Sequence, residues 1–244
     1  MERTLNPLPP RSITLGDREL ARVNVFMRRV YNWMAGGLAL TALVAWWAQG
    51  TPAVMQALFN PATGSPSGLF WVLALAELGL VFGLSGLVQR MSAGTAGILF
   101  AVYAALNGLT ISFIFLLYTS TSLVSTFLVC AGTFAVVSVW SYSTKRDLTR
   151  WGSFLFMGLI GIIIASLVNI FLKSPLLYWI VSYLGVGIFV GLTAYDTQQL
   201  KLMALTNDMG EEVAAKASIV GALKLYLDFI NLFLLLLRIM GDRR

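Results

Sequence analysis

The chain has 244 residues, of which 58% are hydrophobic and 11% are charged, and its mean hydropathy is +0.80. Soluble domains carry about 25% charged residues, so this composition excludes an ordinary soluble domain and indicates a polytopic membrane protein. The net charge of +6 does not indicate a nucleic-acid partner, because the basic residues lie mostly between apolar segments, where they set membrane topology. A single cysteine, Cys130, excludes an intrachain disulfide and is expected to be a buried packing residue.

The first 29 residues are polar, basic and proline-containing. Because this segment has too little apolar surface to build a core, we expect residues 1–29 to be a cytoplasmic tail that is disordered or lies on the membrane surface. The first apolar run begins near Val30 and is not followed by a small-residue cleavage site, which indicates a retained helix and not a signal peptide. Residues 30–244 are predicted to form one membrane domain.

A transmembrane helix needs about 20 apolar residues. The chain supplies such windows at about 30–49, 69–89, 94–117, 123–143, 152–172, 177–199 and 218–240. These windows predict an all-α integral membrane protein, a bundle of seven transmembrane helices. We expect short connections except at residues 50–68, where proline and glycine indicate irregular turns, and at the polar residues 200–217.

Lysine and arginine bias in short loops sets which side of a membrane protein faces the cytoplasm. With a cytoplasmic N-terminus, most basic residues are cytoplasmic and the opposite loops hold only Lys173. Arg238, Arg243 and Arg244 break this rule if the seventh helix crosses completely. We expect a full span, because residues 218–240 correspond to about 34 Å of helix. A re-entrant seventh segment with a cytoplasmic C-terminus is the alternative.

Acidic side chains within apolar sequence are the strongest functional signal in the chain. A carboxylate at the centre of a bilayer helix costs at least about 2.5 kcal/mol, so it is retained where a partner, an ion or water offsets that cost. On the seventh segment, small and polar residues recur at steps of three and four and form one stripe: Gly221, Lys224, Asp228, Asn231 and Arg238. Such a helix is expected at the centre of the bundle, with its stripe facing a polar interior.

The sixth segment carries a second carboxylate, Asp196, near its cytoplasmic end. Acids on consecutive segments suggest one shared site, in which close carboxylates in a low dielectric cannot both ionise cheaply and titrate as a pair. Gly187 and Gly191 form a GxxxG pair that permits close helix packing. Two alternatives remain: Lys224 pairs with Asp228 along one helix, and Asp196 is an interfacial acid solvated by headgroup water.

Other polar groups at membrane depth are few. Glu77 lies midway along the second segment, where it either lines the same interior or hydrogen-bonds a neighbouring helix. Asn107 lies on one face of the third segment, where interhelical hydrogen bonds are the commoner role. Arg90 closes the second segment and serves at least as a topology charge. The possible pore-lining polar residues are Glu77, Asn107, Lys224 and Asn231.

Three stretches resemble the signature of the Bax inhibitor-1 family, and more closely its bacterial inner-membrane branch. They are Leu106-Asn107-Gly108-Leu109-Thr110, Ala194-Tyr195-Asp196-Thr197-Gln198, and Leu225-Tyr226-Leu227-Asp228-Phe229-Ile230-Asn231-Leu232-Phe233 with the ending Leu237-Arg238-Ile239. The similarity covers nearly all of residues 30–241. The stretches that contain the aspartates are the specific part.

The resemblance implies a bundle in which six helices surround the seventh, with a calcium-permeable, pH-sensitive leak through it. It implies that Asp196 and Asp228 form a hydrogen-bonded dyad that senses protons near the cytoplasmic mouth. By their own chemistry the oxygens of Asp196, Asp228 and Glu77 are possible ligands for calcium, although three dispersed acids do not form a calcium cage, and a proton or a monovalent cation is the alternative. The resemblance also implies a latch between the first aspartate and a basic residue that ends the second helix. Arg90 matches that residue by position, although the residues around it differ. No resident cofactor is expected.

The bacterial branch further implies a location in the cell inner membrane. It implies interaction with a membrane-embedded ATP-dependent protease, as a modulator or a resistant substrate. The anti-apoptotic role of eukaryotic members does not transfer to a chain that resembles the bacterial branch. The oligomeric state is not readable from the sequence.

An enzyme is an alternative of another class. Paired aspartates resemble the layout of intramembrane aspartyl proteases, whose carboxylates share a proton and activate water. Those enzymes carry Gly-x-Gly-Asp, whereas Tyr226 and Leu227 precede Asp228 here. The chain has no histidine, which excludes His-Glu-x-x-His zinc chemistry and a Ser-His-Asp triad. We therefore expect a leak channel and not an enzyme, with an interaction or regulatory membrane protein as the second possibility.

Overall fold

The computed structural model describes residues 15–206 and 209–244. Their helices are α1 (Leu15–Gln49), α2 (Pro52–Leu58), α3 (Gly68–Leu87), the 3-10 helix η1 (Val88–Arg90), α4 (Ala93–Ile111), α5 (Ile114–Leu117), α6 (Ser120–Ser143), α7 (Trp151–Leu172), α8 (Pro175–Thr206) and α9 (Glu211–Met240). By length and composition six spans can cross a membrane, or seven if α1 and α2, which meet at a 99° bend, form one span. The predicted all-α membrane bundle is confirmed.

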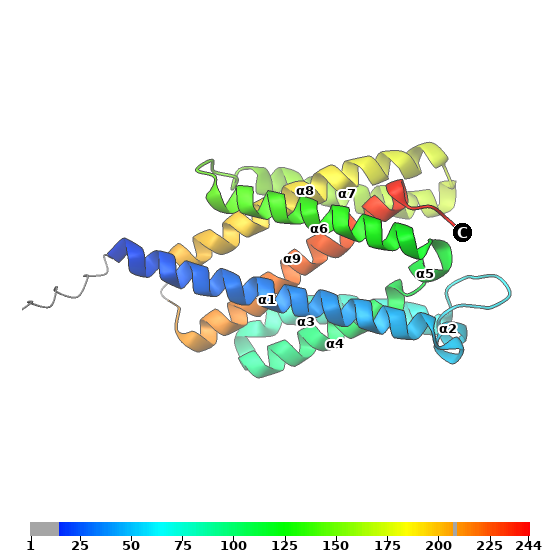
Figure 1. Cartoon of the computed structure of the whole chain (residues 1–244), viewed down its shortest axis with the longest axis horizontal. Helices are drawn as coiled ribbons and strands as arrows, with labels where there is room; N and C mark the ends of the chain where they lie inside the picture. Colours follow the sequence, from blue (N-terminus) through cyan, green and yellow to red (C-terminus); the bar gives the residue numbers. More distant parts are fainter. Residues whose placement is uncertain (1–14, 207–208) are drawn as a thin grey trace, which may run out of the picture.

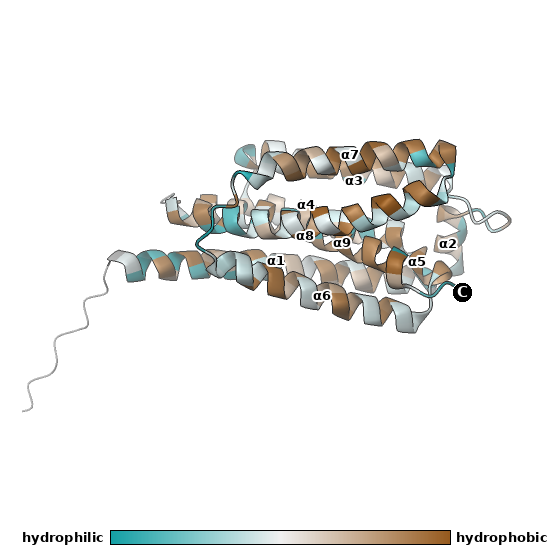
Figure 2. Ribbon diagram, turned by 90° about the horizontal axis from the view of Figure 1, so that it is seen from above, coloured by the Kyte–Doolittle hydropathy of each residue, from teal (hydrophilic) through white to brown (hydrophobic). Residues whose placement is uncertain are grey.

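The long helices run side by side along one axis (Figure 1). One end, called here the N-terminal end, holds the start of α1 and the connections from α3 to α4, from α6 to α7 and from α8 to α9. The opposite, C-terminal end holds α2, α5, the connection from α7 to α8 and the last residues of the chain. Hydrophilic residues concentrate at the N-terminal end and in the connections, and hydrophobic residues along the helices (Figure 2).

Helix α9 is the central element of the bundle. In its most apolar stretch 67% of the residues are buried, whereas the corresponding share for α7 is 6%. α9 packs mainly against α8, α1, α6 and α4, while α7 lies outside and packs on α8. Its 30 residues correspond to about 45 Å of helix, and it runs from the N-terminal end to the C-terminal end (Figure 1). The seventh segment is therefore a continuous helix that is long and apolar enough for the predicted full span, and it has no break of the kind that a re-entrant segment needs.

Glycines set the close contacts of α8. A Cβ atom at Gly185 would lie 2.8 Å from Leu235 of α9, and one at Gly191 would lie 2.6 Å from Leu155 of α7. Gly187 has nothing within 4 Å of its Cβ position. The expected GxxxG contact is thus made by Gly191 but not by Gly187. Gly185, which faces the core, makes the second close approach.

The expectation of a disordered or surface-lying tail through residue 29 is wrong from Leu15 onward, because α1 begins there. Val23, Phe26 and Met27 are buried in the main core together with Val30. Their spacing of three and four residues places them on one face of a helix, and the intervening arginines hid this amphipathic pattern. The part of the predicted tail before Leu15 lies outside the described residues.

The polar segment 200–217 is also helical over most of its length. α8 continues to Thr206 and α9 begins at Glu211, and residues 207–208 lie outside the described part. Leu200 and Ala204 are buried in the core, so the charged residues of this segment occupy the other faces of the same helices. The proline- and glycine-rich segment 50–68 contains α2 and then a turn in which Gly64 has a φ of +66°. Cys130 is buried, as expected.

Candidate functional site

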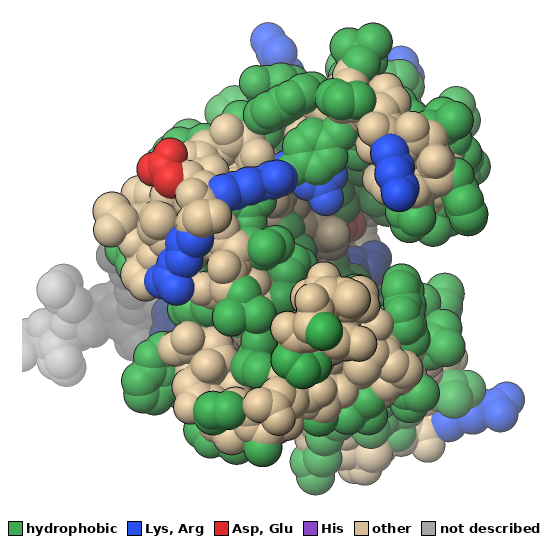
Figure 3. Space-filling model, turned by 90° about the vertical axis from the view of Figure 1, so that its right-hand side faces the viewer, with side chains coloured by type: hydrophobic (Ala, Val, Ile, Leu, Met, Phe, Trp, Pro, Cys, Tyr) green, Lys and Arg blue, Asp and Glu red, His purple; other side chains and the backbone are tan. Residues whose placement is uncertain are grey.

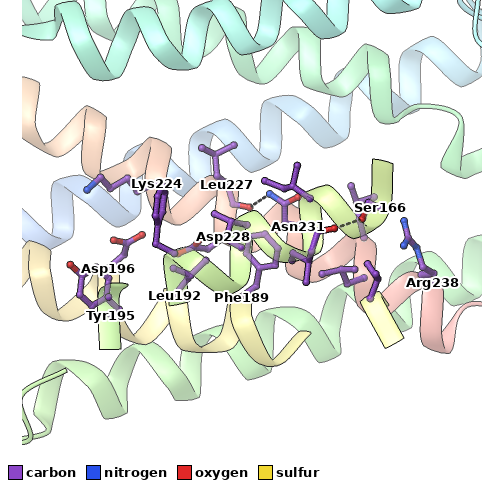
Figure 4. A pocket seen from close by; sticks show the side chains of 18 of the residues that line it. Ser166, Phe189, Leu192, Tyr195, Asp196, Lys224, Leu227, Asp228, Asn231 and Arg238 are labelled. Atoms are coloured by element: carbon purple, nitrogen blue, oxygen red, sulfur yellow. Dashed lines mark hydrogen bonds between the residues drawn. The ribbon is translucent and has the colours of Figure 1, made fainter. Parts of the chain in front are cut away.

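A cavity of about 900 Å³ lies between α7, α8 and α9. Its walls are mainly apolar, and its polar side chains are Ser153, Ser166, Tyr195, Asp196, Lys224, Asp228, Asn231 and Arg238. Four of them follow one another along α9, from Lys224, which lies beside Asp196 of α8, through Asp228 and Asn231 to Arg238 (Figure 4). The predicted polar stripe of α9 therefore lines a cavity. Gly221 is the exception, because its Cβ position lies 2.6 Å from Leu200 in the contact with α8.

The packing of α8 on α9 fixes the heights of the two aspartates. Leu200 lies beside Gly221 and Leu235 beside Gly185, and the two helices run in opposite directions (Figure 1). Interpolation along both helices places Asp196 level with Lys224 and Asp228 level with Leu192. The two aspartates thus line one cavity, and their Cα positions are offset by about one helical turn, or about 5.4 Å along the axis. Because side chains lean toward the N-terminus of their own helix and α8 and α9 are antiparallel, the two carboxylates lean toward each other.

Asp228 is the most isolated polar group of this site. Its side chain is only 5% exposed, and its Oδ2 atom is buried without a hydrogen-bond partner. Within residues 15–206 and 209–244, no hydrogen bond joins Asp228 to Asp196 and no ion pair joins either aspartate to Lys224. The charges of Asp196 and Lys224 are nevertheless near enough to act on Asp228. The shared site of the aspartates is present, whereas a direct hydrogen bond between them stays a prediction.

An amide side chain lies in the middle of the cavity, and basic side chains lie at its C-terminal end. Asn231 Nδ2 donates to the Leu227 carbonyl at 2.8 Å, so its side-chain oxygen is the group that remains for the cavity. The Arg238 guanidinium lies 4.8 Å from the centre of the Tyr178 ring, and Arg243 donates to the Tyr178 hydroxyl at 2.8 Å. Basic side chains therefore border the hollow visible at this end of the molecule (Figure 3).

Glu77 and Asn107 lie on another side of α9 and do not line this cavity. Glu77 accepts hydrogen bonds from Asn107 Nδ2 at 3.1 Å and from Thr110 Oγ1 at 2.8 Å. Asn107 Oδ1 accepts from the Tyr226 hydroxyl at 3.0 Å, and this hydroxyl also meets Thr41 Oγ1 at 2.6 Å. The pore-lining interpretation of Glu77 and Asn107 is therefore not supported. They link α3, α4, α9 and α1, which is the interhelical alternative.

Arg90 is exposed in η1 and makes no hydrogen bond or ion pair with any residue that the structure describes. η1 contacts α9 from the side of α3, whereas Asp196 lies in α8. The predicted latch from Arg90 to Asp196 is therefore not formed in this conformation, and it stays a prediction.

The sequence comparisons support the resemblance that the motifs indicated. The family described as inhibitor of apoptosis-promoting Bax1 matches residues 23–244. The chain belongs to the Bax inhibitor-1 family. It is 52% identical to the inner membrane protein YbhL of Escherichia coli over 232 residues, which cover 92% of this chain and 94% of YbhL. An uncharacterized protein of Deinococcus radiodurans is 47% identical over 227 residues (93% and 94% of the two chains), and one of Borreliella burgdorferi is 44% identical over 232 residues (95% and 98%).

In this member of the Bax inhibitor-1 family, two residues near Asp196 have roles that the sequence interpretation missed. Gln198 is buried and holds the connection from α6 to α7: its Oε1 accepts from Leu148 N at 2.8 Å and its Nε2 donates to the Arg146 carbonyl at 2.7 Å. Tyr195 lies against Gly152 of α7, whose Cβ position is 2.6 Å from the ring. A signal for Gln198 existed, because a polar amide beside an aspartate in apolar sequence needs buried partners.

A tight metal site is absent from the part of the chain that the structure describes, which holds no group of three or more His, Cys, Asp or Glu side chains. Asp196 and Asp228 contribute two carboxylates to the cavity, with the oxygen of Asn231 further along it. Calcium takes about 6–8 oxygen ligands in stable sites. Two carboxylates and one amide oxygen are fewer ligands than such a site needs.

Proposed function

We propose that this protein is a pH-sensitive cation leak channel of the bacterial inner membrane, with calcium as the permeant ion and the cavity between α7, α8 and α9 as part of its path. The observation that carries the proposal is the buried Asp228 carboxylate, whose Oδ2 has no partner although it borders a cavity that also holds Asp196 and Lys224. A buried carboxylate without a partner is costly and marks a functional site in a membrane protein. Membership of the Bax inhibitor-1 family agrees with this proposal.

The pair of aspartates acts as a proton-controlled element. With one proton between them, the carboxylates approach each other and the contact between α8 and α9 is closed. Loss of that proton leaves two like charges, which separate or recruit a cation. The contact is then a two-state element that protons and cations bias in opposite directions. The one-turn offset lies between the backbone positions of Asp196 and Asp228, so a hydrogen bond between their carboxylates can form by rotation of the two side chains or by a small axial shift of α8 along α9.

The test is ion flux in liposomes that contain the purified protein, measured for calcium and for potassium across a pH series. Asn keeps the shape and hydrogen bonding of Asp but cannot ionise. Asp196→Asn and Asp228→Asn should therefore each flatten the pH dependence of calcium flux. The double variant should resemble the single variants, because both residues belong to one unit. Glu19→Gln removes an exposed acid near the start of α1 and is the matched control, with a wild-type profile.

The proposal fails if both single variants keep the wild-type pH profile. It also fails if the effect of the double variant is simply the sum of two small effects. In either case the aspartates have separate structural roles. A potassium flux equal to the calcium flux would retain the leak but remove the assignment of calcium.

The location and orientation belong to the same proposal. The E. coli relative is named an inner membrane protein, and the connections at the N-terminal end of the bundle carry Arg90, Lys145, Arg146 and Arg150. The positive-inside rule then places this end in the cytoplasm. A reporter fused after Arg150 should be cytoplasmic, and reporters within residues 60–66 or after Arg244 should be on the far side. A cytoplasmic signal from the C-terminal reporter would contradict this topology.

A further inference from the structure

A second cavity of about 890 Å³ lies along α7 and α8, and its lining is less polar than that of the first. Its lining is almost entirely apolar, and Ile162, Val181 and Tyr195 contribute to both cavities, so they form the wall between them. Ile180, Tyr183 and Leu184 line it and are exposed on the surface of the protein. In a membrane-spanning bundle this surface meets lipid, so the cavity is a groove that faces the membrane. It is called the α7–α8 groove below.

Glycines of two kinds shape the α7–α8 groove. Gly158 and Gly191 are contact glycines, because their Cβ positions lie 3.0 Å from Ile188 and 2.6 Å from Leu155, and they hold α7 against α8. Gly161 and Gly187 line the same groove but have nothing within 4 Å of their Cβ positions. Close packing therefore explains the first pair but not the second. The absent side chains of Gly161 and Gly187 instead leave space in the groove.

The groove has a basic mouth at the N-terminal end of the bundle. The connection from α6 to α7 closes this end, and Arg146, Asp147, Trp140 and Trp151 line it, with Lys145 and Arg150 in the same connection. The buried amide of Gln198 holds the connection in place through the Arg146 carbonyl and the Leu148 amide. Tryptophan is the side chain enriched at the boundary between hydrocarbon and headgroups. The mouth therefore lies at headgroup depth, with the groove extending into the hydrocarbon.

The charges at the mouth favour an anion. Lys145, Arg146 and Arg150 are exposed in this connection, against one acid, Asp147. Hydrogen bonds from the Thr149 hydroxyl and amide hold the pKa of Asp147 below its usual value, and the charge of Arg150 acts in the same direction. Asp147 is thus ionised and already has partners, while the Arg146 guanidinium makes no hydrogen bond or ion pair with the residues that the structure describes.

We propose that the α7–α8 groove binds an anionic phospholipid from the leaflet on the side of the α6–α7 connection, with its phosphate at Arg146 and an acyl chain along Gly161 and Gly187. The lining residues of α7 run from Trp151 to Ala165, which corresponds to about 21 Å of helix. One leaflet contributes about half of a 30 Å hydrocarbon core, so the groove is long enough for a whole acyl chain. Basic pockets between transmembrane helices on the cytoplasmic side recognise anionic headgroups in this way.

The experiment uses the full-length purified protein in detergent, with phosphatidylglycerol as the anionic probe and phosphatidylcholine as the neutral one. Native mass spectrometry measures how much of each lipid is retained, and thermal unfolding measures the stabilisation. We expect phosphatidylglycerol to be retained and to raise Tm, and phosphatidylcholine to do neither. The double variant Gly161→Leu/Gly187→Leu fills the groove and should weaken phosphatidylglycerol binding at least tenfold. Arg146→Gln should weaken it to a similar extent.

Each variant has a matched control. Gly132→Leu places the same side chain on an exposed glycine of α6 that also has nothing within 4 Å of its Cβ position. Lys173→Gln removes a basic residue at the opposite end of α7. Both controls should bind phosphatidylglycerol as the wild type does. If the double glycine variant is not monodisperse, Ala165→Phe narrows the same groove from another lining position and should give the same loss.

Several outcomes overturn the proposal. If filling the groove leaves binding unchanged while Arg146→Gln abolishes it, the lipid is held by surface charge alone and the groove is not its site. If the two lipids bind equally, the headgroup assignment is wrong. If the glycine variants change the oligomeric state in light scattering and not lipid retention, the groove holds a helix of a second copy. None of these results bears on the flux test of the aspartates, because the side chains of those residues lie in the other cavity.

Discussion

Helix α9 carries polar side chains on two sides, and the two sides differ in whether these side chains have hydrogen-bond partners. Tyr226 points toward α1 and α4, where its hydroxyl meets Thr41 and Asn107. Asp228, two residues later and therefore about 200° around the helix, faces the cavity beside α7 and α8 with one oxygen unpartnered. We call these the satisfied side and the open side of α9.

The difference separates polar groups with hydrogen-bond partners from a buried carboxylate that lacks one. On the satisfied side both oxygens of Glu77 accept hydrogen bonds, and a chain of contacts ties α3 and α4 to α9 and α1. A fully paired buried network of this kind specifies and stiffens the packing. On the open side the buried carboxylate lacks a partner and has space next to it, so its energy depends on what enters the cavity. Intramembrane polarity by itself does not identify a functional residue, whereas a buried carboxylate without a partner beside a cavity requires an explanation.

The largest loss of folding stability should come from a substitution that removes hydrogen bonds on the satisfied side. Asn107→Leu removes the donor to Glu77 and the acceptor for Tyr226, and each buried group left unpaired costs about 1–3 kcal/mol. We expect a loss of about 3 kcal/mol or more, measured as a large fall in Tm in detergent. Asn231→Leu on the open side is the control, because its hydrogen bond stays within its own helix. Equal losses for the two variants would contradict the distinction between the sides.

A smaller loss is expected from Tyr226→Phe, which keeps the ring contacts with Phe100 and Tyr103. Thr41 can still donate to the Ala104 carbonyl, so Asn107 Oδ1 is the main atom that loses its partner. We expect a cost of about 1 kcal/mol in thermal unfolding and no change in the pH profile of flux. A flattened profile would mean that the satisfied side belongs to the ion path.

Asp228→Asn should change folding stability little, and any change should be a gain and not a loss. The substitution keeps the volume of the side chain but removes a buried carboxylate that has no hydrogen-bond partner at Oδ2. We expect Tm to stay the same or to rise by the equivalent of about 1 kcal/mol, although the pH dependence of flux is lost. A fall in Tm as large as that of Asn107→Leu would show that Asp228 has a structural partner and that the open side is not open.

The smallest stability effect is expected for Arg90→Ala. Arg90 is exposed at the end of η1, and surface substitutions of this kind stay within about 0.5 kcal/mol. Arg90 lies where η1 contacts α3 and α9, whereas Asp196 lies in α8. A latch between them would therefore have to reach across from the α3 side of α9 to α8. If that latch forms in the closed state, the resting calcium leak should rise in the variant while Tm is unchanged. Equal leak in both proteins would leave Arg90 as a topology charge.

The apolar windows of the sequence located the helices but not all of their ends. Apolar windows located the membrane-spanning parts, because the cost of exposing a backbone to hydrocarbon imposes about 20 apolar residues per span. They failed at residues 15–29 and 200–217, where helices extend beyond the apolar window and bury only one stripe, such as Phe26 and Ala204. A hydropathy window averages such a stripe with its charged faces.

The sequence by itself determined the class, the central position of α9 and the polar stripe that contains Lys224, Asp228 and Asn231, because composition and a period of three to four residues are local properties. Only the tertiary structure decided that Glu77 and Asn107 have partners and that Asp228 does not, and that Gly187 borders a groove while Gly191 packs against Leu155. Hydrogen-bond satisfaction and the space beside a side chain depend on atoms that are distant in sequence. A buried carboxylate can therefore have hydrogen-bond partners on one side of α9, as Glu77 does, and lack one on the other side, as Asp228 does.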